Sequence, residues 1–187
     1  MKILLINGSP RNDGNCKNAI EIIENKLGKY ENNFEINTIN LVEKKLLGCI
    51  QCDDCKRNGG NCNQNDDSSE IINNIYDSDF VIFVSPVYWW NITGQMKIII
   101  DKFYSKEDEF NHIKKRIGYL TIGAEGQEDD QYHFIKKQLQ YFADGFDWDI
   151  EFNISLTADA KGDLIKNEDS IEDINNVIDR SVKNFLF

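Results

Sequence analysis

Stretches with the apolar pattern of strands alternate along the chain with stretches that have the apolar spacing of helices. Residues 3–6 (ILLI) and 80–84 (FVIFV) are apolar at every position, which is typical of strands covered on both faces. Residues 34–41 instead alternate apolar and polar side chains, a period of two that also indicates a strand. The pattern predicts five strands, at residues 3–6, 34–41, 80–84, 117–122 and 149–156.

Between and after these strands, apolar residues recur at helical spacing. The first such stretch ends near Gly28, a residue that commonly closes a helix. Asp67 and Glu70 have the spacing of a capping box at the start of the next helix. The pattern predicts further helices at residues 67–76, 96–103, 132–142 and 171–185.

The alternation of strand and helix predicts the fold class. Five repeats favour right-handed crossovers and a parallel sheet with helices on both faces. No linker, repeat or low-complexity tract divides the sequence, so we expect one α/β domain over residues 1–187. Ligands of such sheets bind beyond the carboxyl ends of the strands. Function is therefore expected in the segments that leave those ends, at residues 7–15, 86–95 and 123–127.

Composition narrows the class of protein. The chain has 187 residues, the length of one ordinary domain, and no apolar run of about 18 residues that would span a membrane. Its first residues read as a buried strand rather than a signal peptide, so we expect a cytoplasmic protein with reduced thiols. The formal net charge of −11 argues against nucleic acid as a partner, because such binding depends on Lys and Arg that neutralise phosphates.

The first of the three segments, NGSPRNDGNC, has the features of an anion-binding loop. Its two glycines let the backbone curl, Ser9 and Asn15 offer side-chain donors, and Arg11 adds a positive charge. A helix that begins near Cys16 would point its free amide groups into the loop. The Walker A ending and the G-x-G-x-x-G pattern are both missing, so a monophosphate is expected rather than a triphosphate or pyrophosphate. An ordinary Gly- and Asn-rich turn is the alternative.

The second segment, SPVYWWNITGQMK, follows the predicted strand at residues 80–84. Pro86 ends that strand, and Tyr88, Trp89 and Trp90 then place three aromatic rings in a row at the edge of the sheet. Aromatic side chains at such an edge can flank a flat ring, while Asn91 and nearby backbone groups address its heteroatoms. The alternative is that one or two of these rings belong to the core or to a subunit contact.

Four of the five cysteines lie in one loop, at about residues 48–65. Cys49, Cys52, Cys55 and Cys62 have the spacing C-x2-C-x2-C-x6-C, so their thiols can converge on one point. Four thiolates at one point describe a zinc site or an iron–sulfur cluster. The spacing departs from the bacterial ferredoxin run and from the separated pairs of a zinc finger. Free thiols or a reversible disulfide are the third alternative.

The motifs GSPR-x2-GN and SPVYWWNITGQMK, with the cysteines between them, resemble those of the flavodoxin-fold NAD(P)H-dependent FMN reductases. They are most similar to the iron–sulfur flavoprotein branch of that family. The resemblance covers residues 1–126 and implies a three-layer flavodoxin-like fold with strand order 2-1-3-4-5. It also implies three FMN-binding loops, with Ser9, Arg11, Asn15 and Cys16 at the phosphate, Pro86, Val87, Tyr88, Trp89, Trp90 and Asn91 at the isoalloxazine ring, and Gly123, Ala124 and Gly126 at its pyrimidine side.

One position departs from the family pattern. Family members usually carry Thr where this chain has Cys16, and a thiol is a weaker hydrogen-bond donor than a hydroxyl. We therefore expect the backbone of this loop to contribute more to phosphate binding than its side chains do.

The resemblance also implies a function, because a bound flavin carries the chemistry itself. We predict an FMN-dependent oxidoreductase that passes electrons from NAD(P)H to a small acceptor such as a quinone, a nitroaromatic or a flavin. A [4Fe–4S] cluster on the four cysteines would relay single electrons. The alternative function is an electron carrier that exchanges electrons with a ferredoxin-like partner. The family further implies a homodimer or homotetramer in which a neighbouring subunit completes the flavin edge.

Overall fold

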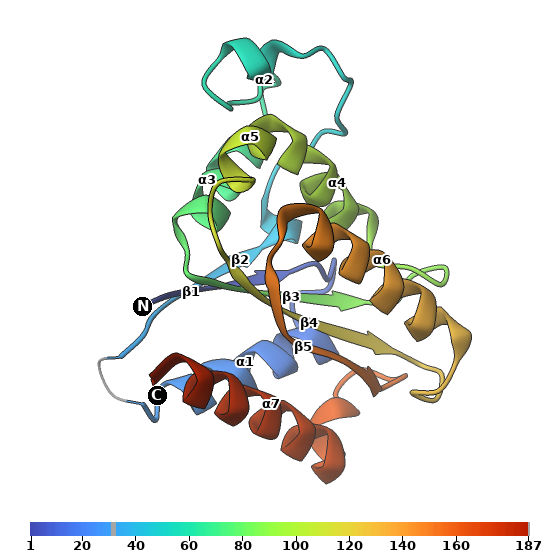
Figure 1. The fold of residues 1–187 in the computed structure, drawn as a ribbon. Coiled ribbons are helices and arrows are strands. Elements are labelled where there is room, and N and C mark those ends of the chain that lie inside the picture. The colour runs from blue at the N-terminus through green and yellow to red at the C-terminus, as the bar shows by residue number, and fades with distance from the viewer. Residues whose placement is uncertain (31–32, 187) are drawn as a thin grey trace.

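A five-stranded parallel sheet forms the centre of the protein, as the computed structural model of residues 1–30 and 33–186 shows (Figure 1). The strand order β2-β1-β3-β4-β5 confirms the predicted order. The predicted strands are confirmed, with bounds extended or trimmed by one or two residues. They are β1 Lys2–Asn7, β2 Glu35–Asn40, β3 Phe80–Pro86, β4 Arg116–Gly123 and β5 Asp149–Thr157.

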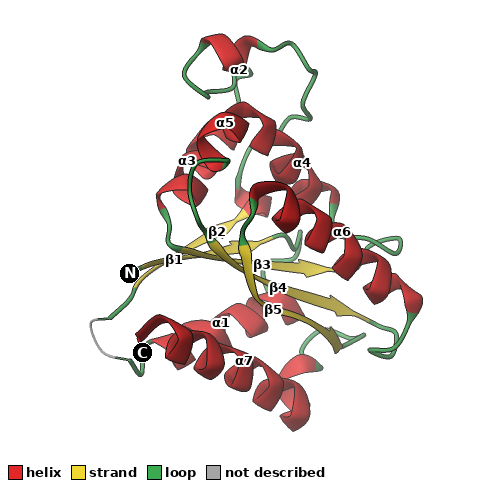
Figure 2. Cartoon of the chain, in the orientation of Figure 1, coloured by secondary structure: helices red, strands yellow, loops and turns green. Residues whose placement is uncertain are grey.

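Helices cover both faces of the sheet, which gives the three layers (Figure 2). One face carries α1 Asn15–Leu27 and α7 Glu168–Leu186, and the other carries α3 Ser68–Asp77, α4 Gly94–Lys102, α5 Glu107–Phe110 and α6 Asp130–Phe146. The remaining short helices are α2 Asp54–Arg57 and the 3₁₀ turns η1 Leu41–Glu43, η2 Phe103–Lys106 and η3 Leu164–Lys166. Among the described residues, no helix combines the length and the apolar character needed to cross a membrane.

Each face of the sheet buries its own hydrophobic cluster. Along β1, Ile3 and Leu5 pack with residues of α1 and α7, whereas Leu4 and Ile6 pack with residues of α3 and α4. Successive side chains of a strand point to opposite faces, so a strand between two helical layers is apolar at every position. This requirement explains the uninterrupted apolar runs of β1 and β3.

The parallel register brings the carboxyl ends of four strands to one edge. Asn7 of β1 lies opposite Val84 of β3, and Gly123 of β4 lies opposite Thr157 of β5. The segments that follow these strands therefore meet at this edge, where ligands of doubly wound sheets bind.

The capping box predicted for α3 is wrong. Asp67 occupies the N-cap position, but its side chain makes no capping hydrogen bond. Its Oδ2 instead accepts a hydrogen bond from the backbone N–H of Lys45, at 2.7 Å. The neighbouring Asp66 accepts from the N–H of Ser68 at 3.2 Å, inside the first turn of the helix. A donor from a distant segment has thus replaced the local partner that the spacing predicted.

Candidate functional site

A cavity of about 180 Å³ opens at the carboxyl edge of the sheet. Its lining contains most of the residues predicted for the FMN site, from all three predicted loops. They are Ser9, Arg11, Asn15, Cys16, Pro86, Val87, Tyr88, Gly123 and Ala124, joined by Gly14, Ile122, Ala158 and Asp159. The predicted residues Trp89, Trp90, Asn91 and Gly126 are not part of this lining in the described structure.

The loop after β1 is held in one conformation by its own polar groups. The N–H of Ser9 donates to Asn7 Oδ1 at 3.0 Å, and Ser9 Oγ accepts from the N–H of Arg11 at 3.1 Å. Thr93, which caps α4, donates its hydroxyl to the carbonyl of Gly8 at 2.7 Å. In its two contacts Ser9 donates its backbone N–H and accepts at Oγ, so its hydroxyl proton remains available to a ligand in the cavity.

The amino terminus of α1 adds unpaired donors to the same cavity. Gly14 is its N-cap and has no side chain that could accept from the first amides, and within the described chain the first turn carries no acidic residue. Uncapped amides and the helix dipole together favour an anion. Arg11 lines the cavity and is exposed, so its guanidinium is free to adjust its position to an anion bound there. These groups form an anion cradle.

Asn15, predicted as a side-chain donor to phosphate, uses its amide elsewhere. Its Nδ2 donates to the carbonyl of Ala160 at 3.0 Å, and its Oδ1 accepts from the N–H of Gly162 at 3.0 Å. The side chain therefore binds the segment between β5 and α7. Only the backbone of Asn15 remains for an anion in the cradle.

Cys16 faces inward from the cradle. Its side chain is 2% exposed and packs in the core between α1 and the sheet. Burial raises the pKa of the Cys16 thiol to about 12. This placement agrees with the expectation that position 16 contributes a backbone amide rather than a hydroxyl-like donor.

We predict that Cys16 resists alkylation in the folded protein. At pH 8.5, iodoacetamide should modify it only after unfolding in urea, as peptide mass spectrometry can show, because the thiolate is the reactive form. The unfolded thiol ionises near pH 9 and the folded one near 12, so the folded state holds the extra proton between these values. The contribution of Cys16 to stability is complete below pH 9 and falls as the pH rises toward 12. Equal labelling before and after unfolding would contradict the prediction.

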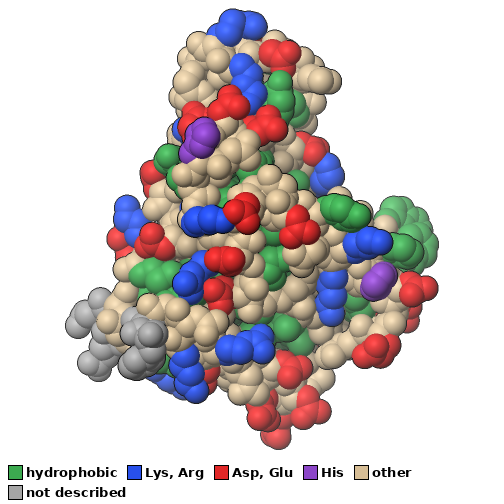
Figure 3. Space-filling view, in the orientation of Figure 1, with side chains coloured by type: hydrophobic (Ala, Val, Ile, Leu, Met, Phe, Trp, Pro, Cys, Tyr) green, Lys and Arg blue, Asp and Glu red, His purple; other side chains and the backbone are tan. Residues whose placement is uncertain are grey.

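The aromatic segment after β3 forms a tight hairpin. The backbones of Tyr88 and Asn91 pair in both directions, at 2.8 and 3.1 Å, and Trp89 and Trp90 form the turn between them. Both tryptophans have positive φ values, 48° and 59°, which non-glycine residues rarely adopt. Their rings stack at 5.0 Å and are 86% and 63% exposed. The apolar projection at the right of Figure 3 lies where Figure 1 draws this hairpin.

The third predicted loop closes the cavity on the β4 side. A Cβ on Gly123 would lie 2.6 Å from the Tyr132 hydroxyl and 3.2 Å from Val87, so only glycine fits there. The carbonyl of Glu125 accepts hydrogen bonds from Tyr132 and Thr157, at 3.1 and 2.8 Å. These contacts fix the backbone that faces the cavity.

The cysteine loop forms a separate site. Figure 1 shows it, with α2, projecting beyond α3, α4 and α5. A cavity of about 20 Å³ is lined by all four of its cysteines, Cys49, Cys52, Cys55 and Cys62. Among the described residues, no three ligand side chains are close enough to hold one metal ion. The four thiols thus line one cavity, and within the described residues they are not grouped as the ligands of a single ion. The metal site itself stays a prediction.

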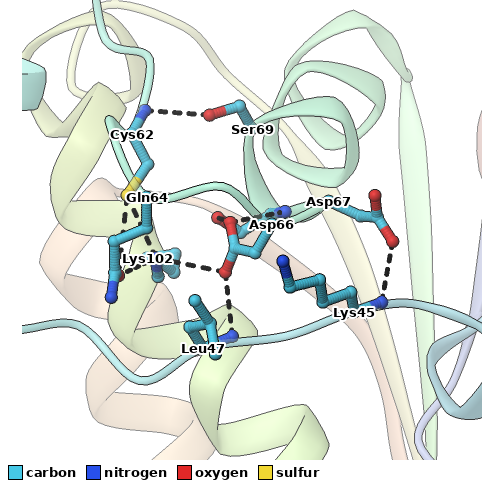
Figure 4. Close-up of polar contacts among 9 residues, drawn as sticks. Lys45, Leu47, Cys62, Gln64, Asp66, Asp67, Ser69 and Lys102 are labelled. Carbon is cyan, nitrogen blue, oxygen red and sulfur yellow. Dashed lines mark hydrogen bonds and ion pairs between the residues drawn. The ribbon is translucent and has the colours of Figure 1, made fainter.

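A buried ion pair closes the base of this loop (Figure 4). The Lys102 and Asp66 side chains are 2% and 0% exposed, with Nζ and Oδ2 3.4 Å apart. Lys102 Nζ also lies 3.0 Å from Cys62 Sγ and 2.7 Å from Gln64 Oε1. Asp66 accepts a further bond from the N–H of Leu47, at 2.9 Å. The pair therefore connects α4 to both ends of the cysteine loop, and we call these two residues the Lys102–Asp66 clasp.

Electrostatics in the clasp favour the ionised carboxylate. Burial opposes ionisation of Asp66, but hydrogen bonds from Ser68 and Leu47 and the charge of Lys102 hold its pKa below the ordinary value. A buried carboxylate in this state depends on its partners, because an unpaired buried charge is costly.

Comparison with known proteins decides the family. The profile of the NADPH-dependent FMN reductases matches residues 1–138. The chain belongs to this family.

Two proteins similar to the chain are named iron–sulfur flavoproteins. The one from Archaeoglobus fulgidus is 40% identical over 103 residues, which cover 54% of the chain and 45% of that protein. The one from Methanocaldococcus jannaschii is 34% identical over 131 residues, 68% of the chain and 66% of that protein. The chain thus spans about half to two thirds of the length of these relatives.

Solved structures support the fold. A flavone reductase superimposes with a TM-score of 0.72 at 17% identity, over 95% of the chain and 60% of that protein. The Trp repressor binding protein of Bacillus subtilis gives a TM-score of 0.67 at 15% identity, over 94% of the chain and 96% of that protein. Both likenesses are evidence of fold alone.

The anion cradle of this FMN reductase family member fits the phosphate of a flavin mononucleotide. The free amides of α1, the hydroxyl of Ser9 and the guanidinium of Arg11 are the donors that one phosphate requires. Val87 and Tyr88 add an apolar wall beside them. The cavity thus has one polar end and one apolar side, as FMN does.

Two parts of the sites were not predicted from the sequence. Ala158 and Asp159, after β5, line the cavity, and Lys102 holds the cysteine loop. The first could have been found, because residues 157–163 also leave the carboxyl end of a predicted strand and contain the turn residue Gly162. Lys102 carried no such signal, since its position on a helix resembles that of any surface lysine.

Proposed function

We propose that this protein binds FMN in the cavity at the carboxyl edge of the sheet and passes electrons from NAD(P)H to a small acceptor such as a quinone, a nitroaromatic or a flavin. The observation that carries the proposal is the anion cradle, which opens into the same cavity as the apolar wall of Val87 and Tyr88. A bound FMN supplies hydride acceptance and one- or two-electron transfer.

The protein's own residues bind and orient the cofactor. Arg11 and the amides of α1 would hold the phosphate, and Ser9 would donate its hydroxyl to it. Pro86, Val87 and Tyr88 would cover apolar parts of the ring and exclude water. Backbone groups of Gly123 and Ala124 would face its pyrimidine side, and the hydrogen bonds to the Glu125 carbonyl hold the loop after β4 in place.

The tryptophan hairpin extends this site outward. A cavity of about 180 Å³ is smaller than the roughly 300–1,000 Å³ typical of sites for ligands of this size. The ring of a bound FMN would therefore reach past Tyr88, toward Trp89, Trp90 and Asn91. The left-handed backbone of both tryptophans supports a role for them, since strain of this kind persists at ligand clamps. A second copy of the chain in a homodimer or homotetramer would cover the exposed face, and Gly126 would lie at the rim.

The four cysteines are proposed to hold a [4Fe–4S] cluster that relays single electrons. What supports this is the shared cavity of the four thiols and the names of the relatives. The four irons of a cluster occupy separate corners, so its thiolates need not meet at the spacing of a single ion. The second candidate function is that of an electron carrier, in which the same cluster would exchange electrons with a ferredoxin-like partner.

An absorption spectrum with iron and zinc analysis, on protein purified without oxygen, tests both sites. Flavin and iron in stoichiometric amounts are expected. A colourless protein that takes up no added FMN would contradict the proposal. Anaerobic stopped-flow mixing with NADH and with NADPH then separates the two functions, because a reductase bleaches its flavin at least as fast as it turns over. A flavin reduced only by a protein donor would favour the electron carrier.

A further inference from the structure

A buried cation lines the cavity of the cysteine loop. Lys102, the last residue of α4, lines it together with Cys49, Cys52, Cys55 and Cys62. The Lys102 side chain is only 2% exposed, although lysines are almost never buried unless they are paired. The position of this charge beside four thiols calls for a role other than contact with solvent.

Three acceptors fix the direction of the Lys102 ammonium group (Figure 4). Nζ lies 2.7 Å from Gln64 Oε1, 3.4 Å from Asp66 Oδ2 and 3.0 Å from Cys62 Sγ. An ammonium group has three protons, so one N–H is left for each acceptor. Gln64 and Asp66 thus orient the group, and the third N–H is directed at the sulfur of Cys62.

The backbone of the loop fits an anionic metal centre. Gln51 and Asp53, on either side of Cys52, have φ values of 52° and 58°, which non-glycine residues rarely adopt. Left-handed residues that alternate with others turn successive N–H groups into one concavity, an arrangement found at many iron–sulfur sites. Tyr104 of η2 holds this turn by donating its hydroxyl to Asp53 Oδ1 at 2.9 Å. The loop therefore combines a backbone suited to an anion around Cys52 with a charged donor at Cys62.

The charge of Lys102 would act on the electron that such a centre accepts. A cluster held by four thiolates is anionic, and reduction adds a further negative charge to it. Hydrogen bonds to the sulfurs are among the features that set the reduction potential of a cluster. A positive N–H from a buried lysine, 3.0 Å from a ligand sulfur, stabilises the reduced form more than the oxidised one. Asp66 opposes this effect, but among the described contacts it reaches Nζ and not the sulfur.

We propose that Lys102 raises the reduction potential of a cluster on the four cysteines by donating an N–H to Cys62 Sγ, and that Asp66 orients this donor and partly offsets its charge. The inference rests on the proposed function, because it requires that the cysteines hold a cluster. It adds which residue outside the ligand set controls how readily the cluster takes up an electron.

The first test is a redox titration of protein purified without oxygen, followed by visible absorption and electron paramagnetic resonance. Lys102→Met with Asp66→Asn removes the donor and keeps the net charge, so the equilibrium constant for cluster reduction should fall about tenfold, a one-electron shift of about 59 mV. Asp66→Asn alone keeps the donor and removes the opposing charge, so its potential should rise. The flavin potential should stay the same in each variant, because the described lining of the flavin cavity contains neither residue.

A second ion pair provides the matched control. Lys44 and Glu70 are joined at 3.2 Å and lie outside the described lining of the cysteine cavity. Lys44→Met with Glu70→Gln also removes one pair at constant net charge. This variant should keep the wild-type cluster potential.

The second test detects the contact itself. Protein grown with isotopically labelled lysine nitrogen should show a coupling between that nitrogen and the reduced cluster in pulsed electron paramagnetic resonance. The coupling should be missing in the double variant of Lys102 and Asp66. A role of Lys102 in stability alone would not produce it.

The outcomes separate the two proposals. A wild-type protein without iron overturns the proposed cluster and this inference together. A wild-type cluster with no lysine coupling, or with a potential that the double variant lowers no more than the control does, overturns this inference alone. If the double variant holds no iron, Asp66→Asn decides the question, because a potential that does not rise above that of the wild type overturns the inference.

Discussion

Replacing Arg11 with methionine is expected to weaken FMN binding by about ten- to a hundredfold. Arg11 brings a formal positive charge to the cavity lining, and a hydrogen bond to a charged partner contributes about 1.5–3 kcal/mol. Methionine keeps an unbranched chain of similar length and removes only the charge and the donors. The dissociation constant can be measured by quenching of flavin fluorescence when FMN is added to flavin-free protein.

Two controls separate phosphate binding from a general loss of the site. Riboflavin lacks the phosphate, so its affinity should be the same in both proteins. Arg180→Met makes the same change at an exposed residue of α7 and should leave FMN affinity within a factor of about two. Equal losses for riboflavin and FMN would show that Arg11 acts on the loop rather than on the phosphate.

Replacing Lys102 with methionine is expected to lower the free energy of unfolding by about 3–5 kcal/mol. The substitution leaves the carboxylate of Asp66 buried without its cation, which is the costly way to break a buried pair. Urea denaturation followed by circular dichroism measures the change. The same variant should increase hydrogen exchange at the amide of Leu47, because Asp66 also accepts its hydrogen bond.

A double-mutant cycle isolates the charge. Lys102→Met with Asp66→Asn removes both charges and keeps an acceptor for Leu47, so at least half of the lost stability should return. Lys97→Met breaks an exposed pair on the same helix, with Asp101, and should cost less than about 1 kcal/mol. If Lys102→Met costs no more than Lys97→Met, the clasp does not stabilise the base of the cysteine loop.

The clasp also has a consequence for the proposed cluster. Cys62 is held from two sides, by Lys102 at its sulfur and by Ser69 at its N–H, whereas Cys49 and Cys52 are exposed. The loop thus presents one thiol held by polar contacts, that of Cys62, one buried thiol, that of Cys55, and two exposed ones.

Sequence reasoning reached the residues that face the cavity because they follow strands. The apolar runs of β1 and β3 identified buried parallel strands, and parallel strands bring their carboxyl ends together. Ser9, Arg11, Tyr88 and Gly123 could therefore be grouped from positions far apart in the chain, and the cavity contains all four. Periodicity also located the helices, although not all of their bounds.

Local spacing was a poorer guide to the partners of polar side chains. Asp67 and Glu70 have capping-box spacing, yet Asp67 binds the amide of Lys45. Asn15 lies in a loop suited to phosphate, yet its amide binds the turn after β5. In each case the partner is a backbone group of a segment that lies more than 20 residues away in the sequence, which local spacing does not indicate.

The sequence by itself thus determined the sheet, its layers and the edge at which a ligand would bind, because burial imposes a periodic pattern that can be read residue by residue. The tertiary structure alone decided that Asn15 binds the turn between β5 and α7 and that Lys102 closes the cysteine loop. Asn15 acts on residues more than 140 positions away, and Lys102 on residues about 40 away. Such contacts leave no periodic trace, since each depends on one side chain meeting one distant segment after the core has formed.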